Sequence, residues 1–461
     1  MDLRNLEELR SAAVGILTFE DPVRVVDADR LRERLIEPLV RAAVLAEDPD
    51  LREAARTLIR GAALAAGAWS ASIQDLYEAR GRGEVAGFTV PAINIRGLTY
   101  DVARAAMRAA AEHRVGAVVF EIARSEIGYT QQRPAEYAAA VLAAAVREGY
   151  RGPVFLQGDH FQISARKYSQ EAASEVRAVK DLIQEAIAAG FLNIDIDTST
   201  LVDLSRASVP EQQRQNFALA AELTAHVRAL EPRGVTISVG GEIGEVGKQN
   251  STVEELCAYM DGYRAELERL GRSLPGISKI SVQTGTTHGG VPLADGSVAS
   301  VKVDFEVLRD LSRVAREAYG LAGAVQHGAS TLPEAAFDRF PRVETAEIHL
   351  ATGFQNQIYD HPAFPEELRR EVRDYCFADL AAERSSGETD EQFLYKTRKK
   401  AFGPFKRRLW DLPASVRGAL GESLEDRFGL LFRKLAVEGT REMVNRIVRR
   451  RDVPVARPAG L

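Results

Sequence analysis

The segment Pro153-Val-Phe-Leu-Gln-Gly-Asp-His-Phe161 decides the fold of this 461-residue chain. It begins with an uncharged, mostly apolar run, and two polar residues, Asp159 and His160, follow that run directly. A stretch long enough for a crossover helix, Ser169–Ala189, comes next, and then a second apolar run, Phe191–Asp197. Strand, helix and strand in this order predict two parallel strands joined by a helix, with polar side chains where each strand ends.

The same unit recurs from Gly87 onward, with helical stretches such as Tyr100–His113 and Ala135–Glu148 between short apolar runs. The runs lack polar alternation, which favours a parallel sheet buried on both faces. Eight units in about 270 residues predict an α/β fold of the (β/α)8 barrel type. A doubly wound open sheet is the competing fold, but no GxGxxG turn follows the first run. The predicted strands are Phe88–Ile95, Gly116–Glu121, Pro153–Gly158, Phe191–Asp197, Val235–Gly240, Ile277–Gln283, Gly323–Gln326 and Thr345–Leu350.

Helical extensions flank the predicted barrel on both sides. In Val26–Ala46 and Leu51–Ala68 apolar residues recur near helical spacing, so residues 1–84 are predicted to pack as helices on the barrel or on a neighbouring subunit. Residues 85–364 form the predicted barrel domain, and residues 365–461 form a C-terminal helical extension.

The C-terminal extension is basic, although the whole chain has a net charge of −6. Glu391–Gly460 holds seventeen Lys and Arg residues against eight Asp and Glu residues, and Lys396–Arg408 is its densest part. We interpret this run as a solvated face or a contact with an acidic neighbour. A subunit contact, or a lid that supplies cations to an anionic substrate, is the alternative.

Composition excludes several classes of protein. With 45% hydrophobic and 27% charged residues the chain is typical of globular proteins, and its net negative charge argues against a general nucleic-acid binder. Two cysteines, Cys257 and Cys376, cannot build a disulfide scaffold, which fits a reducing cytoplasm. The first ten residues are charged where a signal peptide is apolar, and no stretch reaches the ~18 apolar residues of a membrane span. We expect a cytoplasmic homo-oligomer without nucleic-acid or membrane partners.

Four of the seven histidines lie in or directly after predicted strands, where a barrel of this type carries its active site. They are His160, His288, His327 and His349. Imidazole nitrogens suit Zn²⁺, and a catalytic zinc ion needs three protein ligands and an open position.

Carboxylates and small residues accompany these histidines. The carboxylates that end or follow the predicted strands are Asp159, Asp195, Asp197, Glu242 and Glu245. Gly289 and Gly290 follow His288, and Gly328-Ala-Ser330 follows His327; backbone N–H groups of such loops can hold phosphate. A metal, carboxylates and a phosphate cradle on one rim predict carbon–carbon bond chemistry on a sugar phosphate.

Six motifs in chain order resemble the class II, metal-dependent ketose-bisphosphate aldolases, from about Asp75 to Gly353. They are Phe88-Thr-Val-Pro-Ala-Ile-Asn94, Gly158-Asp-His160, Ile194-Asp-Ile-Asp-Thr-Ser199, Gly241-Glu-Ile-Gly244, Thr287-His-Gly289 and His327-Gly-Ala-Ser330. The resemblance implies reversible cleavage of a ketose bisphosphate, fructose 1,6-bisphosphate foremost, into dihydroxyacetone phosphate and an aldehyde.

The resemblance also implies a role for each matched residue. His160, His288 and His327 would bind the catalytic ion, Zn²⁺ or another divalent cation, with Glu242 as a neighbouring ligand. Asp159 would be the acid/base at the aldehyde oxygen, and Asp197 would hold a supporting or secondary cation position. The residues implied in substrate binding are Asn94, Gly289, Gly328, Ser330 and His349, of which Gly289, Gly328 and Ser330 would hold the phosphate.

The chain departs from the family pattern in three places. The loop after Glu245 lacks the family's acidic stretch, so the motif does not place the base that takes the carbon-bound proton; Glu245, Glu254 and Glu255 are the candidates, and Glu245 is taken as the catalytic residue. His349 stands where the family has an Asn, and Ala329 stands where it has a second Gly.

Three other functions compete with a metal-dependent aldolase. The Tyr395–Trp410 region resembles the longer accessory subunits of tagatose-bisphosphate aldolases, so a non-catalytic accessory subunit is the main alternative. A Schiff-base aldolase needs a lysine inside the barrel mouth, but Lys279 begins its strand and Lys248 lies in a loop. A hydrolytic metalloenzyme would need a His-x-His pair on the first strand, which the sequence lacks.

Overall fold

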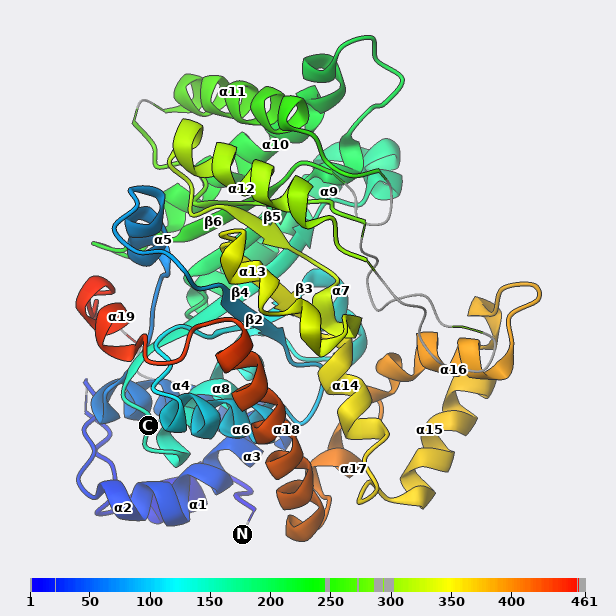
Figure 1. Cartoon of the computed structure of the whole chain (residues 1–461). Helices are drawn as coiled ribbons and strands as arrows, with labels where there is room; N and C mark the ends of the chain where they lie inside the picture. The colour runs from blue at the N-terminus through cyan, green and yellow to red at the C-terminus, as the bar shows by residue number, and fades with distance from the viewer. Residues whose placement is uncertain are drawn as a thin grey trace.

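The computed structural model describes residues 2–20, 22–244, 249–271, 273–285, 293, 302–453 and 455. Its centre is a closed barrel of eight parallel strands with helices around it (Figure 1). Each strand pairs with the next one along the chain, and the last pairs with the first, Val90 opposite Glu347. The strands are β2 (Val90–Asn94), β3 (Val119–Ala123), β4 (Gly152–Gln162), β5 (Asn193–Asp197), β6 (Ser238–Glu242), β7 (Lys279–Val282), β8 (Ala324–Gln326) and β9 (Glu347–Leu350). The predicted (β/α)8 barrel is confirmed, and each predicted run overlaps one strand.

Capping residues in the sequence set the ends of the outer helices. Ser208 and Glu211 form a capping box at the start of α10, and Asp304 caps α12, which ends at Gly320 with a φ of 72°. The helices between the strands are α6 (Thr99–Glu112), α7 (Arg124–Thr130), α8 (Pro134–Arg147), α9 (Ala165–Ala188), α10 (Val209–Leu230), α11 (Val253–Leu270), α12 (Phe305–Tyr319) and α13 (Arg339–Arg342), with 3-10 turns η2 (Ser199–Leu201), η3 (Ala329–Thr331) and η4 (Glu334–Ala336); α14 (Thr352–Tyr359) follows β9.

The N-terminal extension is helical except for a short strand that the sequence did not predict. It comprises α1 (Leu6–Ala13), α2 (Ala28–Arg30), the π-helical turn η1 (Leu31–Leu35), α3 (Ile36–Leu45), α4 (Pro49–Ala66), β1 (Ala68–Ser70) and α5 (Gln74–Gly81). Strand β1 pairs in parallel with the first residues of β4, Ala68 opposite Gly152. The buried Asn193 donates its Nδ2 to the Ala71 carbonyl (3.0 Å) and accepts the Ile73 N–H (2.8 Å). The segment after α4 is therefore hydrogen-bonded to the amino-terminal end of the barrel strands.

The C-terminal extension packs against the barrel and against the N-terminal extension (Figure 1). It comprises α15 (Glu366–Asp379), η5 (Ala381–Glu383), α16 (Asp390–Thr397), η6 (Arg398–Phe402), α17 (Lys406–Trp410), α18 (Ala414–Lys434) and α19 (Arg441–Ile447). Arg417 pairs with Glu37 (2.9 Å), and Arg41 pairs with Asp411 (2.7 Å). These pairs join the two extensions to each other.

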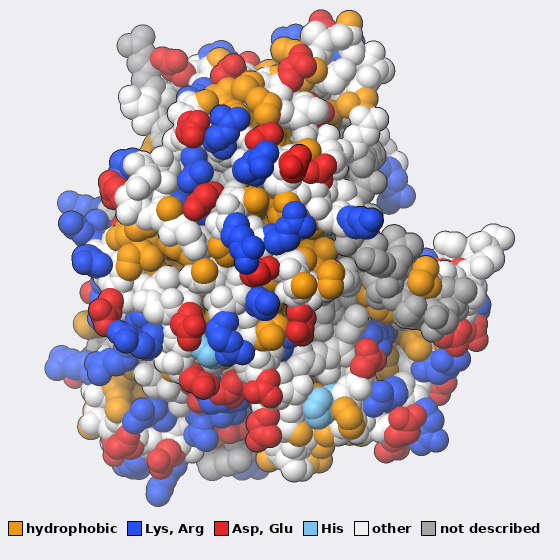
Figure 2. Space-filling model, viewed as in Figure 1, with side chains coloured by type: hydrophobic (Ala, Val, Ile, Leu, Met, Phe, Trp, Pro, Cys, Tyr) orange, Lys and Arg blue, Asp and Glu red, His pale blue; other side chains and the backbone are white. Residues whose placement is uncertain are grey.

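Most of the basic run in this extension has acidic neighbours, as one of the two interpretations predicted. Lys400 pairs with Glu383 (2.5 Å), Lys406 with Glu136 (2.6 Å), and Arg408 with Glu371 (2.9 Å). On the face in Figure 2 basic and acidic side chains are interspersed. Of the helices that the structure describes, none combines the length and apolar character that a bilayer span needs.

The interior of the barrel contains charged residues beneath the mouth. Lys279 is 1% exposed, and its ammonium group pairs with Asp195 (3.0 Å) and with Glu347. It also donates to Gln157 (2.8 Å). A Cβ at Gly240 would lie 2.3 Å from Asp195 Oδ1 and 3.0 Å from the Lys279 chain, so only glycine leaves room for this pair.

Candidate active site

A cavity of about 560 Å³ opens at the carboxyl ends of the strands, the face on which barrels of this type carry their active sites. Seven of the predicted site residues line it: Asn94, Asp159, His160, His327, Gly328, Ser330 and His349; Glu242 does not. They come from β2, β4, β9 and the loop after β8. The structure thus brings together side chains that are up to 255 positions apart in the sequence.

A bulge in β4 turns two consecutive side chains toward this cavity. Neighbouring residues of a regular strand face opposite sides, so Asp159 and His160 would otherwise diverge. The pairing of β4 with β5 shifts between Gly158 and Phe161, and His160 has a φ of +41°. A Cβ at Gly158 would lie 2.4 Å from the Phe161 ring, so the bulge also depends on this glycine. Bulges of this kind re-aim side chains beside active sites.

One group of ligand atoms surrounds His160. Its Nδ1 lies 3.0 Å from Asp197 Oδ2 and 3.2 Å from Glu242 Oε2. Asp197 is held in turn by the Ser199 hydroxyl (2.7 Å) and by Gln162 (2.6 Å). His160, Glu242 and His327 each offer one ligand atom, all within 4.8 Å of one another. Two imidazoles and a carboxylate are the donor types of a catalytic zinc ion, so these residues fit the predicted metal.

The charges in this group depend on one another. Burial raises the pKa of Glu242 to about 7, and the nearby Asp197 charge adds to the effect. Burial also raises the pKa of Asp197, but hydrogen bonds from His160, Ser199 and Gln162 outweigh it and hold that pKa below its ordinary value. Burial lowers the pKa of His160, whereas Asp159 and Glu242 raise it and prevail. In the ion-free chain, the His160 imidazolium therefore balances the carboxylates.

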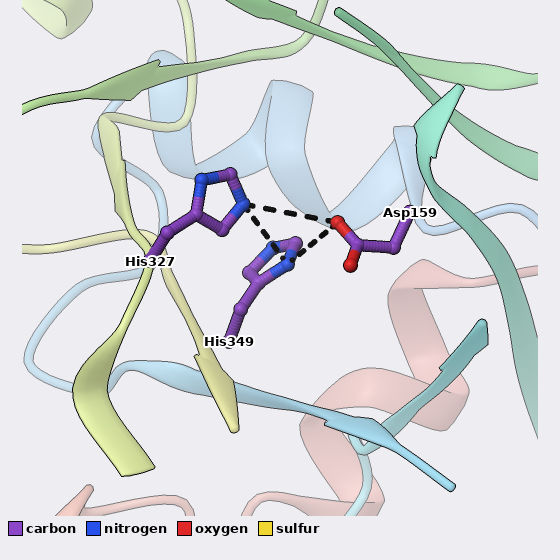
Figure 3. Close-up of side chains that lie close together, drawn as sticks. All are labelled: Asp159, His327 and His349. Atoms are coloured by element: carbon purple, nitrogen blue, oxygen red, sulfur yellow. Dashed lines mark hydrogen bonds and ion pairs between the residues drawn. The ribbon is translucent and has the colours of Figure 1, made fainter. Parts of the chain in front are cut away.

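A second group of ligand atoms joins Asp159, His327 and His349 (Figure 3). His327 Nε2 lies 3.1 Å from His349 Nδ1, and that nitrogen lies 3.2 Å from Asp159 Oδ1. The pKa of Asp159 is raised by burial but lowered more strongly by His160, His349 and His327, so it lies well below its ordinary value. Asp159 is therefore held as a carboxylate in the ion-free chain.

The buried Lys279–Glu347 ion pair contacts this second group through His349. Glu347 Oε1 lies 2.7 Å from His349 Nε2, and Glu347 is also bonded to Lys279 and to the Tyr77 hydroxyl. Burial lowers the pKa of Lys279, but Asp195 and Glu347 outweigh it and raise that pKa above its ordinary value. Lys279 thus stays an ammonium group, and it does not line the cavity. A Schiff base at Lys279 is incompatible with this arrangement.

The predicted phosphate cradle lies beside His327. Gly328 has a φ of +69°, which favours glycine, and Ser330 lies in the following turn η3. Ser330 Oγ accepts the Ala351 N–H (2.5 Å), so its own proton can be donated to a ligand. Asn94 lines the cavity, but its amide donates to Asp159 (2.8 Å) and Glu126 (3.0 Å), so it also positions Asp159.

Four cationic side chains that the sequence motifs did not indicate also line the cavity. Arg96 pairs with Glu126 (2.6 Å), and Arg124 pairs with Glu175 (2.5 Å). Lys167 and Lys399 also line the cavity, and neither ammonium group makes a hydrogen bond or ion pair with any residue that the structure describes. Lys399 belongs to the basic run, so the charge pattern pointed to its segment but not to the residue.

Three predicted site residues, Glu245, His288 and Gly289, lie outside the described residues. The alternative bases are described. Glu255 forms the capping box of α11 with Thr252 (2.7 Å), and Glu254 is exposed; neither lines the cavity.

Comparison with protein families identifies the class of protein that this barrel and its site define. The family model described as "Fructose-bisphosphate aldolase class-II" matches residues 76–401, which is more than half of the chain. The chain therefore belongs to the class II fructose-bisphosphate aldolase family. No curated protein matches the chain in sequence.

Several solved structures are similar to this chain, and the first described here shares its fold. A probable tagatose 6 phosphate kinase from Sinorhizobium meliloti 1021 is 20% identical with a TM-score of 0.52, over 80% of this chain and 95% of that one. The YdjI aldolase from Escherichia coli K12 is 12% identical with a TM-score of 0.46, over 79% of this chain and 97% of that one. The fructose-bisphosphate aldolase from Campylobacter jejuni is 17% identical with a TM-score of 0.47, over 81% of this chain and 96% of that one.

Proposed function

We propose that the chain is a metal-dependent aldolase that reversibly cleaves a ketose bisphosphate into dihydroxyacetone phosphate and an aldehyde. The observation that carries this proposal is the meeting of His160 and His327 with Asp159 at one cavity, where Glu242 offers a third ligand atom within 4.8 Å of both histidines. Family membership supports the reaction type, and fructose 1,6-bisphosphate is the first substrate to test.

The metal is proposed to be Zn²⁺, held by His160, His327 and Glu242 together with the predicted ligand His288. A divalent ion bound there would act as a Lewis acid on the ketone oxygen and stabilise the negative charge that develops on it during cleavage. The donor set of the three described residues fits such an ion.

Asp159 is proposed to move the proton at the aldehyde oxygen. In the cleavage direction its carboxylate takes the proton of the hydroxyl on the carbon that becomes the aldehyde, the carbon–carbon bond breaks, and its electron pair remains on the ketone half. Asn94 holds Asp159 Oδ2 (2.8 Å), so the carboxylate keeps one orientation. A second acid, assigned to Glu245, would then protonate the carbon of the ketone half.

The two ends of the cavity are proposed to bind the two phosphates. The N–H groups after Gly328 and the Ser330 hydroxyl suit the phosphate of the ketone half. Lys399 lacks a partner of opposite charge among the described residues, and it suits the phosphate of the aldehyde half.

The experiment is a coupled assay for triose phosphate release from fructose 1,6-bisphosphate and tagatose 1,6-bisphosphate, with and without a chelator. Metal content is measured on the same samples by plasma mass spectrometry. We expect activity that the chelator abolishes, and we expect His327→Ala to lose both metal and activity. His226→Ala is the matched control, since His226 lies on α10, does not line the cavity and has its Nε2 3.3 Å from the Lys180 carbonyl.

A non-catalytic accessory subunit is the second candidate, and the long C-terminal extension favours it. Such a subunit would not need metal ligands around a cavity. A protein without bound metal and without activity toward either bisphosphate would refute the aldolase and leave the accessory subunit.

A further inference from the structure

His327 lies between two sets of ligand atoms. Its Nδ1 faces Glu242, 3.9 Å from Oε1, on the side of the proposed zinc position. Its Nε2 faces Asp159, 3.8 Å from Oδ1, and His349, 3.1 Å from Nδ1. The proposed zinc position makes no use of His349, so the second set needs its own explanation.

The second set has the dimensions of a metal site. The three atoms in Figure 3 form a triangle with edges of 3.1, 3.2 and 3.8 Å. Ligands about 2.0–2.1 Å from a tetrahedral zinc ion are about 3.3–3.4 Å from one another. The edges bracket this separation, so one ion fits about 2 Å from all three atoms with little movement of the side chains.

Neighbouring residues orient two of the three ligands. Glu347 binds His349 Nε2 (2.7 Å), so Nδ1 is the nitrogen that faces Asp159 Oδ1 (3.2 Å); Nδ1 also lies 3.1 Å from Glu121 Oε1. Asn94 binds Asp159 Oδ2 (2.8 Å), which leaves Oδ1 for an ion. A histidine whose far nitrogen is held by a carboxylate is a common arrangement around bound metals.

Charge in the barrel also favours a cation at this point. The described part of the barrel interior and its mouth hold six buried carboxyl groups and one ammonium group, that of Lys279. The carboxylates are Glu121, Asp159, Asp195, Asp197, Glu242 and Glu347. Buried charges are costly unless they are compensated, so an ion beside Asp159 would share in balancing these carboxylates.

We propose that Asp159, His327 and His349 bind a divalent transition-metal ion at a position separate from that of His160 and Glu242. One carboxylate and two imidazoles favour Zn²⁺ over the oxygen-seeking Mg²⁺ and Ca²⁺. All three residues line the cavity, so the fourth coordination position opens toward substrate. With both positions filled, His327 would offer one ring nitrogen to each ion. The inference rests on the proposed function for the first ion position, but its test requires no reaction.

The test is a titration of the ion-free full chain with Co²⁺, followed by visible absorption and by plasma mass spectrometry. We expect two Co²⁺ per wild-type chain. His349→Asn should bind one, because it loses the second position, and Glu242→Gln should bind one, because it loses the first. His226→Ala, the matched control, should bind two.

A second variant keeps all the ligands. Glu347→Gln removes the charge that orients His349, which is also a partner of Lys279, and it should weaken one of the two Co²⁺ sites by about 10–100-fold while the other keeps its affinity. Circular dichroism checks that each variant is folded.

Two results would overturn the inference. One is a wild-type chain that binds a single Co²⁺, retained by His349→Asn with the same absorption spectrum. The other is a folded Glu347→Gln variant with two unchanged sites. A chain that binds two ions but cleaves no ketose bisphosphate would refute the proposed function alone.

Discussion

Replacing Lys279 with methionine removes an ammonium group that is 1% exposed and paired with Asp195 (3.0 Å) and Glu347. The methionine fills a similar volume, so the main effect is electrostatic. Removing one partner of a buried ion pair costs about 3–5 kcal/mol, because the remaining charge is left uncompensated. We expect the free energy of unfolding of Lys279→Met to be lower than wild type by about this amount at pH 7.

The loss should depend on pH in a defined direction. Burial raises the pKa of Glu347, but Lys279 and His349 outweigh it and hold that pKa below its ordinary value of 4.5. A carboxyl group of this kind stabilises the fold above its unfolded pKa and loses that contribution as pH falls. Without Lys279 much of the contribution disappears. The difference between wild type and variant should therefore be largest near neutral pH and shrink below about pH 4.5.

Urea unfolding followed by circular dichroism at pH 7 and pH 4 measures both effects. Lys180→Met is the control, since Lys180 pairs with Glu222 (2.6 Å) in an exposed position, and an exposed pair contributes about 1 kcal/mol or less. If Lys279→Met lowers stability by less than about 1 kcal/mol at pH 7, or equally at both pH values, the buried charge network does not stabilise the barrel.

Three further predictions concern the cavity and the barrel interior. Asp159→Asn should lower kcat for cleavage by about 10²-fold or more in the coupled assay, because the amide cannot accept the hydroxyl proton; unchanged kcat would remove Asp159 from the mechanism. Lys399→Met should raise KM for the bisphosphate by about 10-fold or more with kcat nearly unchanged. Burial and Arg96 lower the pKa of Lys399 below its ordinary value of 10.5, so the affinity of the wild-type protein for the bisphosphate should fall as pH rises through that pKa. A Lys399→Met variant whose affinity falls in the same way at alkaline pH would contradict the assignment. Gly240→Ala should lower the free energy of unfolding, measured in urea, by about 1–3 kcal/mol, because the added Cβ would lie 2.3 Å from Asp195 Oδ1. A variant as stable as the wild type would show that the Asp195 side chain can move aside at no cost.

The barrel could be predicted because its strands are buried on both faces and punctuated by helical stretches. Apolar runs such as Pro153–Gly158 carry that signal locally, without reference to partners far along the chain. The polar residues at the strand ends were also visible, and the structure brings Asp159, His160, His327 and His349 to one cavity.

Other features could not be predicted because they depend on contacts between distant segments. Gly158 and Phe161 form the bulge of β4 only when the strand is paired with β5. The interior position of Lys279 is defined by Asp195 and Glu347, which lie 84 and 68 positions away in the sequence. Lys399 reaches the cavity only because the C-terminal extension packs back on α7.

Because β1 pairs with β4 and the residues after it hydrogen-bond to Asn193, the barrel depends on the N-terminal extension for part of its own structure. A chain cut before residue 85 would leave the edge of β4 at Gly152–Val154 unpaired, and it would strip Asn193 of its bonds to Ala71 and Ile73. An open strand edge invites pairing with other chains, and each buried polar group left unsatisfied costs about 1–3 kcal/mol. Truncation or domain exchange at this boundary is therefore expected to yield protein that aggregates. The extension and the barrel should be kept together in any engineered variant.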